Sequence, residues 1–267
     1  MRTPSQPIIH LMTAVMQVIL KLFSYFLWFS PIGIASLICN ALLRVESDIS
    51  VTFELLGYFA MTIVVGLVFH QLVYLQVMYV LIVRSNPVVM FINSLKSWIT
   101  IFATTSSYAV MPEMIRTCEK HGVDRRVYGF VVPFCAGTNR NGSAIFVTAA
   151  TIFIAQMNGI SLNPATTFTI GLLVSLAMFA LPGVPSASMV CILMILTSTG
   201  LPTNSINMLF ALEWILDRLR STSNVLSTCY CAAIVNKLVT DDIERWDALQ
   251  LHEGNEQTVV FLKESAV

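Results

Sequence analysis

Long apolar stretches separated by short polar segments run through most of the chain. The first covers residues 8–43 and the second covers residues 55–83, and each ends at charged or turn-forming residues. A helix needs about 20 consecutive apolar residues to cross a bilayer. The pattern therefore predicts a spanning helix over 8–46, kinked at Pro31, and a second spanning helix over 55–84.

The apolar stretches that follow are interrupted near their middle by small polar residues or by proline and glycine. Segments 88–118, 121–160 and 163–202 each carry such an interruption, whereas 205–238 does not. Within a bilayer, irregular backbone is tolerated only where protein or a water-filled cavity satisfies its polar groups. The pattern predicts, in this order, a re-entrant helical hairpin over 88–118, a broken helix over 121–160, a second re-entrant hairpin over 163–202 and a long helix over 205–238.

The order of these elements is repeated, because each interrupted hairpin is followed by a helix with polar groups inside it. Paired interruptions at corresponding positions are typical of inverted repeats whose half-helices meet near the middle of the membrane. The N-termini of half-helices present free N–H groups and a positive dipole end to an anion. A simple helical bundle with Gly and Pro kinks is the alternative interpretation.

Composition narrows the class of protein. Of the 267 residues, 56% are hydrophobic and 11% are charged, against about 25% charged residues in a soluble globular domain. So little charge excludes a soluble enzyme, a disordered protein and a nucleic-acid binder as leading interpretations. It predicts an all-α integral membrane protein, with the polar residues 241–267 as a cytoplasmic tail.

The helix predicted over 205–238 carries ionisable residues at membrane depth. Six polar side chains fall within an arc of roughly 100° on its surface, namely Glu213, Asp217, Arg220, Ser221, Asn224 and Thr228. A charged side chain at this depth costs at least about 2.5–3.5 kcal/mol, so these groups are expected to face a cavity and one another. The pattern favours a binding surface over a structural Asp–Arg pair that only joins helices.

Several motifs, in order along the chain, resemble the excitatory amino acid transporters, within the dicarboxylate/amino acid:cation symporters of solute carrier family 1. Residues 106–112 are similar to the serine-rich tip of the family's first re-entrant hairpin, 139–143 to its Asn-Met-Asp-Gly-Thr motif, 183–185 to the tip of its second hairpin and 217–226 to its eighth helix. The resemblance starts near the family's fifth helix. It implies part of an elevator-type fold, with a scaffold helix over 8–46 and a transport domain over 50–240.

The resemblance also implies a substrate site. Arg220 would bind the side-chain carboxylate of glutamate or aspartate, and Asp217 would bind the amino group. Asn224 and the backbone around Ser107 would bind the main-chain carboxylate, while Ser143 would supply a hydroxyl that the family takes from Thr. The implied set further includes Ser106, Gly183, Val184 and Ser221 for the substrate, with Asn139, Asn141 and Asn224 as a residual sodium site.

The cation sites depart from the family pattern. Asn141 and Thr228 stand where the family has aspartates, and Phe146 and Val147 stand where eukaryotic members have Tyr and Glu. Arg140 adds a cation, so the charges at the matched positions sum to zero here. We therefore expect its guanidinium to act as a tethered cation in space left by sodium, or else to turn into water at a site that binds no ligand.

These features favour a secondary active symporter of acidic amino acids in the plasma membrane, with weakened sodium coupling. The expected partners are the acidic substrate, the lipid bilayer and further subunits in a homo- or hetero-trimer. Sodium is the candidate coupling ion, and we expect no other cofactor, no catalytic residue and no nucleic acid. Two alternatives stay open: an inactive or ligand-binding subunit that assembles with full-length transporters, and a neutral amino acid carrier, because specificity depends mainly on Arg220.

Overall fold

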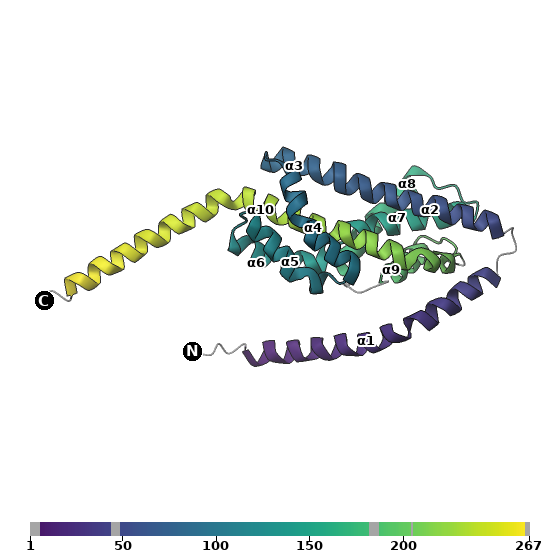
Figure 1. Cartoon of the computed structure of the whole chain (residues 1–267), viewed down its shortest axis with the longest axis horizontal. Coiled ribbons are helices and arrows are strands. Elements are labelled where there is room, and N and C mark those ends of the chain that lie inside the picture. The colour runs from purple at the N-terminus through teal and green to yellow at the C-terminus, as the bar shows by residue number, and fades with distance from the viewer. Residues whose placement is uncertain (1–5, 44–48, 182–186, 204, 265–267) are drawn as a thin grey trace.

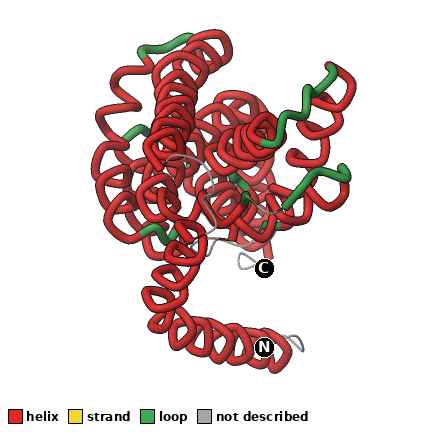
Figure 2. Tube along the Cα trace, turned by 90° about the vertical axis from the view of Figure 1, so that its right-hand side faces the viewer, coloured by secondary structure: helices red, strands yellow, loops and turns green. Residues whose placement is uncertain are grey.

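The regular structure of the chain is helical wherever it is described. The computed structural model describes residues 6–43, 49–181, 187–203 and 205–264. The elements, in chain order, are α1 (Gln6–Leu43), α2 (Ile49–Phe69), a π-helical turn η1 (His70–Tyr74), α3 (Leu75–Val83), α4 (Pro87–Thr104), α5 (Ser107–Lys120), α6 (Arg125–Thr138), α7 (Asn141–Met157), α8 (Pro164–Ala180), α9 (Ala187–Ser198) and α10 (Ile206–Glu264). This confirms the all-α prediction (Figures 1 and 2).

Short polar residues set the start of four helices. Each of these residues has an extended backbone and a side-chain oxygen that accepts a hydrogen bond from an N–H in the first turn, which is the usual way to cap an N-terminus. The caps are Asn86 for α4, Ser106 for α5, Asp124 for α6 and Asn163 for α8. Proline follows directly at the first position of α4 and α8, where its missing N–H costs nothing.

The predicted interruptions correspond to breaks between successive helices. Helices α4 and α5 meet at Thr105, whose φ of 55° is left-handed, and α6 and α7 meet at Asn139 and Arg140. The interruption between α8 and α9, at 182–186, lies outside the described residues. Contacts join α4 to α5 and α8 to α9. That each pair enters the membrane and leaves it on the same side stays a prediction.

Helix α10 joins two separate apolar cores. Its N-terminal part packs with α2, α7, α8 and α9 through residues such as Leu209 and Leu216. Its middle part packs with α3, α4, α5 and α6 through residues such as Val225 and Tyr230. Figure 1 shows α10 passing through the bundle and projecting beyond it, while α1 runs beneath the bundle. Between the two cores, α10 presents a run of buried polar residues from Arg220 to Asn224.

The π-helical turn lies against this polar run. His70 and Ser223 form a hydrogen bond of 2.7 Å between Nδ1 and Oγ, and the Gln71 amide donates to the Thr222 hydroxyl at 3.2 Å. The Trp98 indole N–H in turn donates to Gln71 Oε1 at 2.9 Å. His70 therefore serves as a helix–helix contact.

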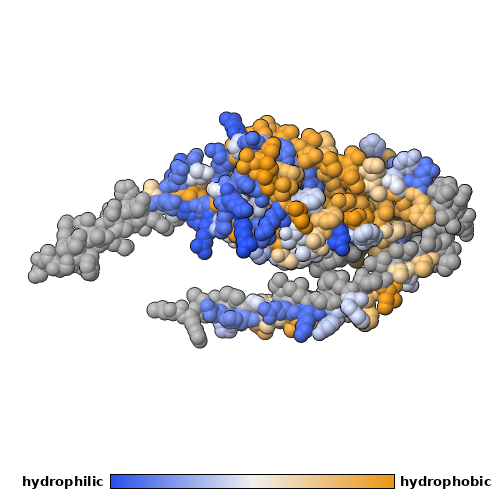
Figure 3. Space-filling model, in the orientation of Figure 1, coloured by the Kyte–Doolittle hydropathy of each residue, from blue (hydrophilic) through white to orange (hydrophobic). Residues whose placement is uncertain are grey.

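Two helical stretches in the described part of the chain are long and apolar enough to cross a membrane, Phe53–Val83 and Pro87–Thr104. Apolar side chains also cover much of the surface in Figure 3, and large ones such as Phe168 and Phe179 are 70% exposed or more. An apolar surface of this extent requires a lipid or protein neighbour. These features agree with a helical membrane protein.

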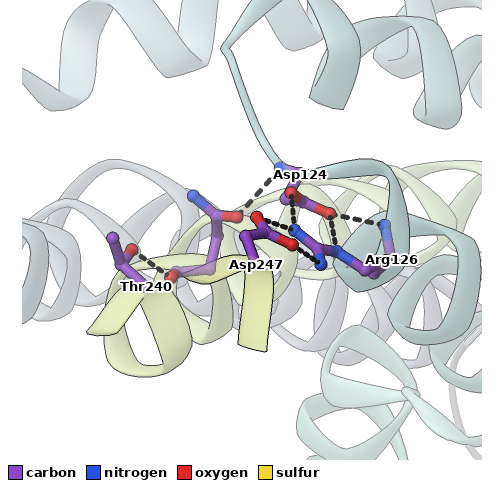
Figure 4. Close-up of polar contacts among 5 residues, drawn as sticks. Asp124, Arg126, Thr240 and Asp247 are labelled. Atoms are coloured by element: carbon purple, nitrogen blue, oxygen red, sulfur yellow. Dashed lines mark hydrogen bonds and ion pairs between the residues drawn. The ribbon is translucent and has the colours of Figure 1, made fainter. Parts of the chain in front are cut away.

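A cluster of charged residues fastens the far part of α10 to the start of α6 (Figure 4). Arg126 donates to Asp247 at 2.7 and 3.0 Å and to Asp124 at 3.0 Å. The Asp124 backbone N–H donates to the Asn236 side chain at 2.9 Å. Beyond this point α10 stays helical through the predicted polar tail as far as Glu264.

We predict that acid releases this cluster. The hydrogen bonds from Arg126 lower the pKa of both the Asp124 and the Asp247 carboxyl groups. A carboxyl group whose pKa is lowered in the folded state stabilises the folded contact at pH values above about 3.9, the ordinary pKa of Asp. That stabilisation is lost as the pH falls through the lowered pKa. A spin label at the exposed Glu244 should become more mobile as the pH falls below that range.

Asp247→Asn should show the mobile signal already at neutral pH, and the exposed Asp241→Asn serves as the matched control. Equal mobility in the two variants at neutral pH would contradict the role of Asp247.

Candidate functional site

A small polar cavity lies where the two apolar cores meet. It is lined by Thr105, Ser107, Arg140, Ser143, Leu181, Ala187, Ser188, Asp217, Ser221 and Asn224. The cavity measures about 20 Å³, which is room for roughly one water molecule. The structure therefore brings together five of the predicted substrate residues, namely Ser107, Ser143, Asp217, Ser221 and Asn224.

Three helices begin at this cavity. Ser107 is the first residue of α5, Ser143 is in the first turn of α7, and Ala187 and Ser188 are the first two residues of α9. A helix N-terminus carries unpaired N–H groups and a positive dipole end. The cavity is consequently suited to a negatively charged group.

Arg220 lies beneath the cavity in a buried ion-pair network. Its guanidinium donates to both carboxylate oxygens of Glu213, at 2.5 and 3.1 Å, and to one oxygen of Asp217, at 2.8 and 3.1 Å. The Phe146 ring lies 4.3 Å from the guanidinium carbon, a cation–π distance. Arg220 is 1% exposed, so its charge is balanced by acids one and two turns earlier on its own helix.

Arg140 supplies the other buried cation. It donates to the Ser107 hydroxyl at 3.1 Å and to the Ala136 carbonyl oxygen at 2.9 Å. Its Nε is the one buried side-chain nitrogen or oxygen without a hydrogen-bond partner in the described part of the chain. Arg140 and Asp217 line the same cavity, so the cavity presents a cation and an anion.

The break between α6 and α7 is fixed to α10 by hydrogen bonds. The Asn139 amide donates to the Asn224 carbonyl oxygen at 3.1 Å and to the hydroxyls of Ser227 and Thr228 at 2.7 and 3.0 Å. The Gly142 N–H donates to the Asn224 side chain at 2.8 Å. We refer to this set of contacts as the α7–α10 joint. It requires glycine at 142, because a Cβ there would overlap the Arg220 carbonyl oxygen.

The predicted sodium residues separate in space. Asn139 and Asn224 are in contact at the joint, whereas Asn141 is exposed and lines a larger neighbouring cavity. The oxygens around the Asn139 amide are neutral, and they accept hydrogen bonds from it. Among the described residues, no three His, Cys, Asp or Glu side chains are grouped in a way that could hold a metal ion.

The remaining predicted residues either play another part in the structure or lie outside the described residues. Ser106 caps α5, where its hydroxyl accepts from the Ala109 N–H at 3.4 Å, and Gly183 and Val184 lie outside the described residues. Sequence reasoning missed Ser188 as a lining residue, although it is a hydroxyl just inside the apolar helix that follows the predicted hairpin tip. It also missed Phe146 as a partner of Arg220. The roles assigned to all these residues stay predictions.

Comparison with known proteins identifies the family. Residues 1–238 match the Sodium:dicarboxylate symporter family. The chain belongs to this family. The chain is 37% identical to excitatory amino acid transporter 2 of Rattus norvegicus over 244 residues. These residues make up 91% of the chain and 42% of the relative. It is 37% identical over 232 residues to excitatory amino acid transporter 1 of Homo sapiens, covering 86% of the chain and 43% of the relative.

Membership of the sodium:dicarboxylate symporter family confirms the resemblance found in the sequence. The relatives that the chain matches are named as transporters, and the family as symporters. The chain spans about two fifths of the length of these relatives.

We predict that Gly142→Ala loosens the α7–α10 joint of this family member. The added methyl must displace the α10 backbone at Arg220, and overpacking of a tight contact costs roughly 1–3 kcal/mol. The variant should unfold at a lower temperature in detergent than the wild type.

The matched control is Gly129→Ala, also within a helix, where an added Cβ meets nothing within 4 Å. Replacing glycine by alanine at an open helical position is expected to stabilise by roughly 0.5–1 kcal/mol. Similar thermal shifts for the two variants would show that the close approach at Gly142 is unimportant.

Proposed function

We propose that this chain forms the substrate-binding part of a secondary transporter for acidic amino acids in the plasma membrane, with weakened sodium dependence. The observation that supports this most is the cavity that presents Arg140, Asp217 and the starts of three helices. An amino acid carries a carboxylate and an ammonium group, and this cavity offers a complement for each.

The positions of the lining groups suggest how the substrate is oriented. The ammonium group pairs with Asp217, while the main-chain carboxylate lies between Ser107, Arg140 and the Asn224 amide. Arg140 already donates to the Ser107 hydroxyl, which places its charge at the start of α5. Charge-assisted hydrogen bonds to a carboxylate are about twice as strong as neutral ones. The Nε N–H of Arg140, which has no partner in the structure, can donate such a bond to a bound carboxylate.

Selectivity for an acidic side chain requires Arg220 to exchange partners. Its guanidinium is shared by Glu213 and Asp217. When Asp217 binds the substrate ammonium group, Arg220 loses part of that interaction and can take the second substrate carboxylate. The cavity is too small for an amino acid as it stands, so binding also widens it. In the transporter, this part moves as a transport domain against a scaffold within a trimer.

Weakened sodium dependence follows from the balance of charge. Glu213 and Asp217 are matched by Arg140 and Arg220, so a site with these four side chains needs no further cation to be neutral. The Asn139 amide donates into the oxygens of Ser227, Thr228 and the Asn224 backbone, none of which carries a charge. Sodium remains the coupling ion that the family uses, but its share of the binding free energy is smaller here.

We predict that binding of aspartate to the purified chain differs little between sodium and choline buffers, and that Arg140→Met weakens it strongly. A lost charge-assisted contact costs roughly 1.5–3 kcal/mol, which is a drop in affinity of about tenfold or more. Calorimetric titration measures both effects.

The control for this experiment is Arg125→Met, which removes the same charge at an exposed position outside the cavity. Steep sodium dependence in the wild type would rule out the role of Arg140 as a tethered cation. Absence of binding in every buffer would favour an inactive subunit.

We further predict that Arg220→Cys shifts binding from acidic to neutral amino acids. The variant removes the guanidinium that selects the second carboxylate, and truncating one member of a buried ion pair costs roughly 3–5 kcal/mol of stability. A double variant, Arg220→Cys with Glu213→Gln, removes most of that stability loss. Competition by serine against labelled aspartate distinguishes the two specificities, and unchanged aspartate affinity in the double variant would refute the assignment.

A further inference from the structure

Two cysteines on different helices have their thiols in contact. Cys135 lies in the last turn of α6 and Cys231 lies in α10, and the two side chains are neighbours where these helices pack together and line one cavity. Both thiols are free. Two thiols this close, on two packed helices, are the minimum arrangement from which a disulfide can form.

The pair is open to a small molecule. Both cysteines line a mostly apolar cavity of about 480 Å³, which shares Arg140 with the polar cavity. Cys231 is partly exposed, while Cys135 is 8% exposed. Cys231 is therefore the more accessible of the two to a small neutral oxidant.

The chain contains a second thiol pair that serves as an internal comparison. Cys118 and Cys229 are also neighbours, within one apolar core, but both are 0% exposed. The two pairs share their chemistry and the helix α10, and they differ in access. If an oxidant reacts with Cys135 and Cys231 but not with the second pair, the difference consequently reflects access through the cavity rather than the chemistry of the thiols.

We propose that Cys135 and Cys231 form a peroxide-reactive site that closes into a disulfide between α6 and α10. The Cys231 thiol loses its proton as its sulfur attacks hydrogen peroxide, the O–O bond breaks, and the departing hydroxide takes up that proton and leaves as water, so that Cys231 becomes a sulfenic acid. The Cys135 sulfur then attacks the Cys231 sulfur, the S–O bond breaks, and the departing hydroxide takes the thiol proton of Cys135 and leaves as a second water. Both cysteines are oxidised and one peroxide is reduced to two waters.

The disulfide would act on the α7–α10 joint. Cys135 lies one turn before Asn139, and Cys231 lies three residues after Thr228. Asn139 and Thr228 are already joined by a hydrogen bond of 3.0 Å. A covalent bond one turn away makes this contact permanent, so oxidation fixes the end of α6 to α10 at the edge of the substrate cavity.

The test is peroxide treatment of the purified full-length chain in detergent, followed by mass spectrometry. The expected product has lost two hydrogens and yields a linked peptide joining Cys135 to Cys231, which dithiothreitol reverses. Oxidation of the exposed Cys39 shows that the reagent is active. Cys135→Ser should leave a sulfenic acid at Cys231 that dimedone traps, whereas Cys231→Ser should leave Cys135 largely unreacted.

Cys118→Ser and Cys229→Ser are the matched control variants, and both should form the Cys135–Cys231 link as the wild type does. The proposal is overturned if Cys39 is oxidised while Cys135 and Cys231 stay reduced, or if the linked peptide joins Cys118 to Cys229 instead. It is equally overturned if Cys135→Ser gives no dimedone adduct at Cys231. These readouts do not depend on ligand binding or transport.

Discussion

The burial of Arg220 between two apolar cores is the constraint on which the rest of the site depends. A guanidinium with 1% exposure is tolerated only if its charge and its N–H groups are satisfied. Glu213 and Asp217 meet this need from the same helix, and Phe146 covers the guanidinium face from α7. Burial of this one stripe of α10, together with the Phe146 contact from α7, fixes the rotation of α10, and that rotation decides which polar side chains face the cavity.

The α7–α10 joint determines how the two halves of the broken helix, α6 and α7, lie against α10. Gly142 lets the start of α7 approach the α10 backbone, and the Asn224 side chain receives the Gly142 N–H at 2.8 Å. Asn139 holds the end of α6 on the following turn of α10. The interruption of the helix is thus stabilised by polar contacts that a continuous helix could not make, and it is what directs the N-terminus of α7 toward the cavity.

Sequence reasoning succeeded where the information is local and failed where it is not. The breaks near Thr105 and Asn139, the polar stripe from Glu213 to Thr228 and the family itself were all readable, because each is a short motif or a periodic pattern. Local patterns do not reveal which groups meet across helices. The stacking of Phe146 on Arg220 and the outward position of Asn141 therefore came only from the structure.

Helix α10 is also continuous from the polar cavity to the charged cluster at Asp247. Arg220 and Asp247 are separated by 27 positions, the difference of their numbers, which is about 40 Å at roughly 1.5 Å per residue. A stiff rod of that length is a lever arm. A tilt of about 5° at the cavity would displace Asp247 by roughly 3–4 Å, so a small rearrangement around Arg220 would be enough to pull Asp247 away from Arg126 at the other end of the helix.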